Sequence, residues 1–160
     1  MSTISSTVSS TVSSTVSSAA TGRPAAPGVR YDGIDALLAD ARSRLDRVDV
    51  ETAYREALGG AVLVDIRPAA QRAAEGEVHP AVGPLVVERN VLEWRFDPRS
   101  DARLEEASYD TRILVLCQEG YTSSLAADAL RSLGLDATDV VGGFKAWREA
   151  HLPVACRGDG

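Results

Sequence analysis

The chain has 160 residues, with 17 basic and 23 acidic side chains and a formal net charge of −6. This length suits one domain with a modest core and an appendage. The acidic balance argues against nucleic acids and anionic membranes as partners, because both are bound by basic patches. The chain also lacks a long apolar run and a basic segment before an apolar one, so we expect neither a membrane span nor a secretory signal.

The N-terminal segment is built from a four-residue repeat, and residues 3–18 read TISSTVSSTVSSTVSS. It carries no charge and too little apolar mass to bury a core, which predicts a disordered Ser/Thr/Val-rich tail over residues 1–30. A helix is predicted within residues 31–47, because apolar side chains recur there at helical spacing. We expect this helix to pack on the edge of the domain; a helix that binds a partner protein is the alternative.

Residues 48–155 alternate predicted strands with predicted helices. Strands are expected over 61–65, 85–87, 113–116 and 138–141, and helices over 51–58, 68–75, 123–133 and 144–150. This alternation indicates an α/β fold with a mostly parallel central sheet and helices on both faces. Trp147, in the last helix, is expected to anchor the core.

Residues 112–124, RILVLCQEGYTSS, carry the strongest functional signal. The apolar run Ile113–Leu116 is typical of a parallel strand covered on both faces, so Cys117 follows at the carboxyl end of a strand, where open α/β sheets place their sites. Gly120 centres a turn into a helix, whose free amides and positive dipole end would stabilise a thiolate. We interpret Cys117 as a nucleophile; an inert cysteine that closes a core strand is the alternative.

The loop after this strand resembles the active-site loop of rhodanese-like sulfurtransferases, and two further stretches agree with that family. These are AVLVDIRP at 61–68 and VGGFKAWREAHLPV at 141–154. The resemblance implies a single-domain, rhodanese-like α/β fold over residues 48–155. It also implies transfer of a sulfane sulfur, through a persulfide on Cys117, from a small-molecule or protein-borne donor to a thiol or cyanide acceptor. In the loop, the resemblance is carried by Cys117, Gly120, Thr122 and Ser123.

By the same resemblance, Asp65 and Arg67 support the active-site loop or contact an anionic substrate, and a bidentate pair suits either role. A surface ion pair or a helix-capping aspartate is the alternative. Tyr121 would shape the pocket opening, and the Thr122 hydroxyl could bind a terminal sulfur or oxygen. The active-site loop then comprises Gln118, Glu119, Gly120, Tyr121, Thr122 and Ser123.

Substrate preference is indicated by a departure from the family pattern. Gln118 and Glu119 stand where thiosulfate-using relatives carry basic residues, so thiosulfate is expected to be a poor donor. Arg89 or Arg95 could reach the pocket rim, and the sequence selects neither.

Two other functions are alternatives to sulfur transfer. A cysteine phosphatase needs an arginine at the end of its loop, where this chain has Thr122 and Ser123. A non-catalytic or redox-sensing rhodanese-like module, with a possible protein partner, is the second alternative.

The cysteine count points to a reducing compartment. Cys117 and Cys156 are too few for a disulfide framework, which favours the cytoplasm. Together with His79 and His151 they match no common zinc spacing, so we expect neither a metal nor a cofactor. Cys156 is expected to be incidental; a resolving thiol is the alternative.

Overall fold

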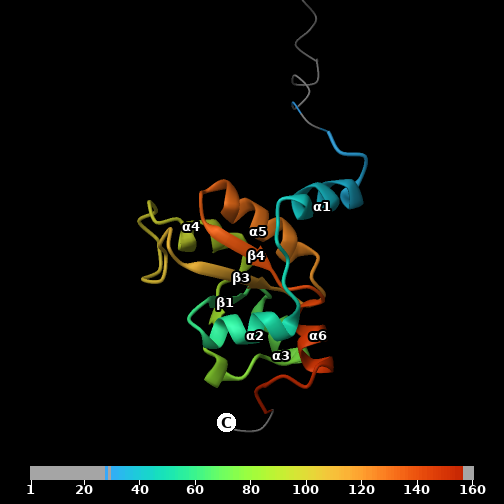
Figure 1. Cartoon of the computed structure of the whole chain (residues 1–160), viewed down its shortest axis with the longest axis vertical. Helices are drawn as coiled ribbons and strands as arrows, with labels where there is room; N and C mark the ends of the chain where they lie inside the picture. The colour runs from blue at the N-terminus through green and yellow to red at the C-terminus, as the bar shows by residue number, and fades with distance from the viewer. Residues whose placement is uncertain (1–27, 29, 157–160) are drawn as a thin grey trace, which may run out of the picture. The chain divides into compact units, whose positions relative to one another are not determined.

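The computed structural model of the chain describes residue 28 and residues 30–156. The tail predicted over residues 1–30 therefore lies almost entirely outside the described residues. A compact unit begins at Tyr31 and contains all the helices and strands described below (Figure 1).

Four parallel strands form the sheet, in the order β2-β1-β3-β4. In β1, Asp65 lies opposite Leu116 of β3, so the two strands end at the same edge. Cys117, which follows β3, and Asp65 are thus brought to one edge of the sheet. The strands are β1 (Val62–Asp65), β2 (Leu85–Val86), β3 (Arg112–Leu116) and β4 (Asp136–Asp139).

Helices cover both faces of this sheet, which confirms the predicted α/β architecture (Figure 1). On one face lie α1 (Ile34–Ser43), α4 (Leu92–Phe96) and α5 (Thr122–Ser132); on the other lie α2 (Val50–Leu58), α3 (Ala69–Glu75) and α6 (Gly143–Glu149). Two 3-10 turns, η2 (Pro80–Val82) and η3 (Arg89–Val91), flank β2.

The core consists of two layers, one on each face of the sheet. Successive side chains of a strand point to opposite faces, and β3 contributes to both layers in turn. Ile113 and Val115 pack with the α4 and α5 layer, whereas Leu114 and Leu116 pack with the α2 and α6 layer. All four side chains are fully buried, as expected for a central parallel strand.

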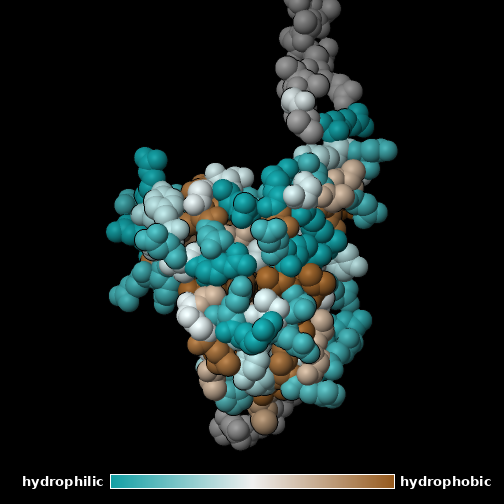
Figure 2. Space-filling model, viewed as in Figure 1, coloured by the Kyte–Doolittle hydropathy of each residue, from teal (hydrophilic) through white to brown (hydrophobic). Residues whose placement is uncertain are grey.

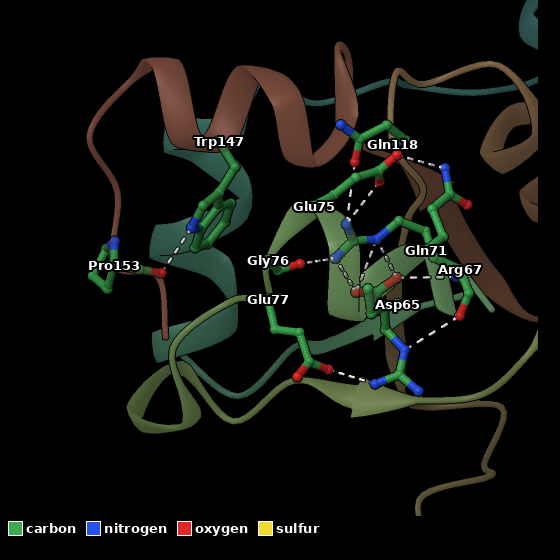
Figure 3. A network of polar contacts seen from close by, with 10 residues as sticks. Asp65, Arg67, Gln71, Glu75, Gly76, Glu77, Gln118, Trp147 and Pro153 are labelled. Atoms are coloured by element: carbon green, nitrogen blue, oxygen red, sulfur yellow. Dashed lines mark hydrogen bonds and ion pairs between the residues drawn. The ribbon is translucent and has the colours of Figure 1, made fainter. Parts of the chain in front are cut away.

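Trp147 anchors the second layer, as predicted. Its side chain is fully buried, and its ring meets that of Tyr54 edge-on at a centroid distance of 5.7 Å. The indole N–H donates to the Pro153 carbonyl at 2.9 Å (Figure 3). The buried polar end of the ring is therefore satisfied, which holds the C-terminal segment against α6.

Helix α1 packs on the domain through α5, which agrees with the predicted edge packing. Leu38 and Ala41 are buried, and Arg44 makes a two-bonded ion pair with Asp128 of α5. Ile34, at the first turn of α1, is 64% exposed. The apolar residues at helical spacing therefore identify the side of α1 that contacts α5, with the exception of Ile34.

Three local predictions need correction. Pro68 was expected as the first helical residue, but its ψ of 155° is extended, so α3 begins at Ala69. The last strand was expected over 138–141, but it runs over Asp136–Asp139, because this is the stretch that pairs in register with β3, from Arg112 to Val115. Helix α4 was not predicted, because only Leu92 and Phe96 of its five residues are buried.

The face of the molecule in Figure 2 is mainly hydrophilic, with hydrophobic side chains in small areas. Among the described residues, no helix combines the length and the apolar composition needed to cross a bilayer.

Candidate active site

Cys117 lies in the loop that joins the end of β3 to the start of α5. The residue is only 4% exposed, and its Sγ accepts the Gly120 N–H at 3.2 Å. Gly120 has a φ of +84°, and a Cβ there would lie 2.8 Å from the backbone nitrogen of Gly142. A glycine is thus required at this turn, because any side chain would clash with the backbone behind the loop.

The start of α6 holds the other side of this loop. The Phe144 N–H donates to the Cys117 carbonyl at 2.8 Å, and the Lys145 N–H donates to the Gln118 carbonyl at 3.0 Å. Gly143 allows this close approach, since a Cβ there would lie 2.4 Å from the Cys117 oxygen. Gly142 and Gly143, in the motif at 141–154, therefore allow the N-terminus of α6 to bind the backbone at Cys117.

A pocket of about 480 Å³ opens beside Cys117. Of the predicted loop residues, four line this pocket with the cysteine: Gln118, Glu119, Tyr121 and Thr122. Tyr121 is 59% exposed and therefore lies at the opening. The structure also selects between the two candidate rim arginines. Arg89 lines the pocket, whereas Arg95 donates to the Ala102 carbonyl and lies elsewhere.

Asp65 and Arg67 form a buried ion pair, and Arg67 also lines the pocket (Figure 3). Each residue is 2% exposed, and the Arg67 guanidinium donates to both carboxylate oxygens of Asp65, with Nη2 to Oδ2 at 2.7 Å. Its Nη1 also donates to Gln118 Oε1 at 3.1 Å and to Glu75 Oε2 at 3.3 Å. Arg67 thus links the end of β1 and the end of α3 to the active-site loop.

The environment of Arg67 has opposing effects on its ionisation. Burial lowers the pKa of Arg67, but the hydrogen bonds and charges of Asp65 and Glu75 outweigh that effect and raise the pKa above its usual value. The guanidinium also lies over the Phe144 ring, 4.3 Å from its centroid. Arg67 is therefore a permanent cation, whose charge is largely neutralised by its two carboxylate partners.

Ser123 does not line the pocket. Its hydroxyl is buried and donates to Asp139 Oδ2 at 2.8 Å, as does the Ser124 hydroxyl. Asp139 is fully buried at the end of β4 and also pairs with Arg47, Nε to Oδ1 at 2.9 Å. These groups brace the start of α5 from behind the loop.

Sequence reasoning found Ser123 but not its partners Arg47, Ser124 and Asp139, nor Arg42, whose Nε donates to Ser124 Oγ. Asp139 could have been found, because it ends a parallel strand as Asp65 does. The predicted strand began two residues late, however, and so placed Asp139 inside the strand and not at its end. Arg42 and Arg47 gave no signal, because they lie more than 70 residues before the loop they contact.

Glu119, on the pocket rim, has a cation nearby. Its Oε1 lies 3.9 Å from Lys145 Nζ, and both side chains are more than half exposed. Water screens such an exposed pair, so Lys145 offsets the Glu119 charge only in part.

The two histidines and two cysteines of the chain do not form a metal site in the described part of the structure. Within the described ranges, no group of three or more His, Cys, Asp or Glu side chains could hold a metal ion. His79 Nδ1 accepts the Ala81 N–H and caps the turn η2. Cys156 is exposed and does not line the Cys117 pocket.

Known proteins resemble the chain in sequence and in fold. Thiosulfate sulfurtransferase GlpE from Vibrio cholerae is 40% identical over 52 residues, which are 32% of this chain and 49% of that protein. The chain thus spans about half the length of the curated relatives it matches.

Two solved structures extend the comparison. A protein of unknown function from Rhodopseudomonas palustris, described as a possible tyrosine phosphatase, has a TM-score of 0.70 at 28% identity, covering 81% of this chain and 98% of that one. The polysulfide-sulfur transferase homodimer from Wolinella succinogenes has a TM-score of 0.62 at 22% identity, covering 78% and 88%, and shows the shared fold. The family model for the rhodanese-like domain matches residues 49–150. Since that match spans well over half of the chain, the protein belongs to the rhodanese-like domain family.

Proposed function

We propose that this protein is a sulfurtransferase that carries a sulfane sulfur as a persulfide on Cys117. The observation that carries the proposal is the setting of the Cys117 thiol. It borders a pocket, lies just before the N-terminus of α5, and accepts a backbone N–H from Gly120 at 3.2 Å. The similarity to a thiosulfate sulfurtransferase supports the same chemistry.

The proposed reaction consists of two displacements at sulfur. In the first, the Cys117 thiolate attacks the outer sulfur of the donor; an S–S bond forms, and the bond between that sulfur and the rest of the donor breaks. With thiosulfate the electron pair leaves on sulfite. In the second, cyanide or a thiolate attacks the outer sulfur of the persulfide. The S–S bond then breaks, and its electron pair returns to Cys117 as a thiolate.

The loop would stabilise negative charge at both stages. The Gly120 N–H already donates to the cysteine sulfur, and α5 begins five residues after the cysteine, at Thr122, with the positive end of its helix dipole at that N-terminus. The outer sulfur of the persulfide would extend into the pocket, within reach of Thr122 and Tyr121. Because these dipoles are held before the reaction, little reorganisation is needed as charge develops.

Phosphatase activity has less support in this site. Phosphate monoesters require a cationic fork that binds several oxygens of the transferred group. The residue six positions after the cysteine is Ser123, whose hydroxyl is buried and turned toward Asp139. Arg67 lines the pocket, but Asp65 and Glu75 already occupy its donors.

Intact-mass measurement on the purified full chain tests the proposal. After incubation with a sulfane-sulfur donor and removal of excess reagent, the mass should increase by one sulfur atom, and cyanide should remove that atom as thiocyanate. A non-catalytic module would show no such addition. Failure of thiosulfate, polysulfide and a low-molecular-weight persulfide to load the protein would refute sulfur transfer.

Donor choice is expected to depend on the two opposite charges at the pocket rim. Glu119→Lys should raise kcat/KM for thiosulfate, and Arg89→Gln should lower it, because an anionic donor is repelled by the first side chain and attracted by the second. Each effect should be roughly fivefold at low ionic strength and should shrink in added salt. Initial rates with thiosulfate and with an uncharged sulfane-sulfur donor, at two salt concentrations, provide the measurement.

The neutral donor is the control, since its rates should change little in either variant. If each variant changed the rates with both donors equally, or if the thiosulfate rate did not depend on salt concentration, the charges at the pocket rim would not select the donor.

A further inference from the structure

Two arginines bind one carbonyl of the active-site loop from behind. The Gly120 oxygen accepts Arg42 Nη2 at 2.7 Å and Arg47 Nη2 at 3.0 Å. Arg42 belongs to α1, and Arg47 lies just before α2, so both precede the family match at residues 49–150. A segment outside the family domain therefore reaches its active-site loop.

Both guanidinium groups are themselves held in place. Arg47 is paired with the buried carboxylate of Asp139, and Arg42 Nε donates to Ser124 Oγ at 3.0 Å. The Arg42 guanidinium also lies near the Tyr121 ring, 5.6 Å from its centroid. Charge-assisted hydrogen bonds from fixed donors are stronger than neutral ones, so the position of the Gly120 oxygen is well determined.

The direction of this carbonyl determines the direction of the next amide. The described peptide bonds are all trans, and in a planar trans peptide the C=O and N–H groups point to opposite sides. Because the Gly120 oxygen points toward the arginines, the Tyr121 N–H points away from them. The preceding amide, Gly120 N–H, already donates to Cys117 Sγ.

We propose that Arg42 and Arg47 are positioning residues, which fix the Gly120–Tyr121 peptide so that the loop amides face the sulfur carried by Cys117. The inference rests on the proposed sulfur transfer, and neither arginine touches the reacting atoms in this assignment. It gives residues 31–47 a role in the active site that the family domain alone does not supply.

Arg42→Gln and Arg47→Lys test this proposal, with Arg44→Gln as the matched control. Arg44 lies in the same segment and makes a two-bonded ion pair with Asp128 of α5, but it contacts no loop residue that the structure describes. The lysine at position 47 keeps the cation beside Asp139 and so protects the fold. Melting temperatures of all three variants should be compared first, because similar values exclude a general loss of structure.

The first measurement follows the backbone amides of Gly120 and Tyr121 by NMR in the reduced protein. In Arg42→Gln and Arg47→Lys, both signals should shift and their hydrogen exchange should accelerate about tenfold, whereas Arg44→Gln should match the wild type. The second measurement is persulfide lifetime after loading, followed by intact mass. It should fall about tenfold in the two test variants, with a lower kcat and a nearly unchanged KM.

The two proposals fail in different ways. If the wild type loads no sulfur, sulfur transfer is wrong, while the amide signals of the reduced protein still report on the arginines. If the wild type loads sulfur but all three variants share its persulfide lifetime and amide signals, Arg42 and Arg47 do not position the loop.

Discussion

Replacing Cys117 by serine is expected to abolish sulfur transfer while leaving the protein folded. Serine has nearly the size of cysteine, and its oxygen can still accept the Gly120 N–H that now reaches Sγ. A hydroxyl cannot hold a sulfane sulfur as a persulfide, so the first displacement has no product on the enzyme. The rate of thiocyanate formation from a donor and cyanide should therefore fall to that of the uncatalysed reaction.

Cys156→Ser is the matched control, because it makes the same chemical change at an exposed position that does not line the pocket. It should keep the wild-type rate and accept one sulfur atom by intact mass. Turnover that survived in Cys117→Ser and disappeared in Cys156→Ser would move the nucleophile to the C-terminal segment. Circular dichroism and the melting temperature should be unchanged in both variants.

Asp65→Asn is expected to reduce the free energy of unfolding by about 3 kcal/mol, because it leaves the buried Arg67 cation without its main partner. Asp65 accepts bonds from the Arg67 side chain and from the Arg67 backbone N–H, and both residues are 2% exposed. Asparagine keeps the shape of aspartate but not its charge. The loss can be measured from urea unfolding curves of the purified variants.

Asp136→Asn makes the same change in an exposed ion pair, where Asp136 Oδ1 lies 2.9 Å from Arg112 Nη1. Its side chain is 53% exposed, so the cost should be at most about 1 kcal/mol. Equal losses in the two variants would mean that burial does not set the strength of the Asp65–Arg67 pair. Arg67 also donates to Gln118, so Asp65→Asn should lower turnover even where the protein remains folded.

Much of the fold was accessible from local sequence patterns. The apolar run Ile113–Leu116 predicted a buried parallel strand, and the structure has that strand at the centre of the sheet. Helical spacing predicted the helix that the structure shows as α1. These signals are readable because side-chain periodicity reports directly on which face of an element is buried.

The ends of helices and strands, and the short elements, were harder to predict from the sequence. Helix α4 has five residues, too few for a period to be seen, and β4 starts at an exposed aspartate that resembles a turn. Because of that shift, the role of Asp139 was missed. Its carboxylate accepts hydrogen bonds from two serine hydroxyls and pairs with Arg47. Whether a polar residue lies at the end of a strand or inside it depends on the register of the strand. Pairing with the neighbouring strand sets that register.

By itself, the sequence determined the order of strands and helices, the parallel sheet, and the placement of Cys117 beside a glycine turn at the end of a strand. It also brought Asp65 and Cys117 to one edge, since parallel strands end together. Only the tertiary structure decided that Arg89 rather than Arg95 lines the pocket, and that Arg42 and Arg47 bind the loop carbonyl at Gly120. The physical reason is that these contacts join side chains far apart in the chain, whose meeting depends on how helices pack and not on any local periodicity.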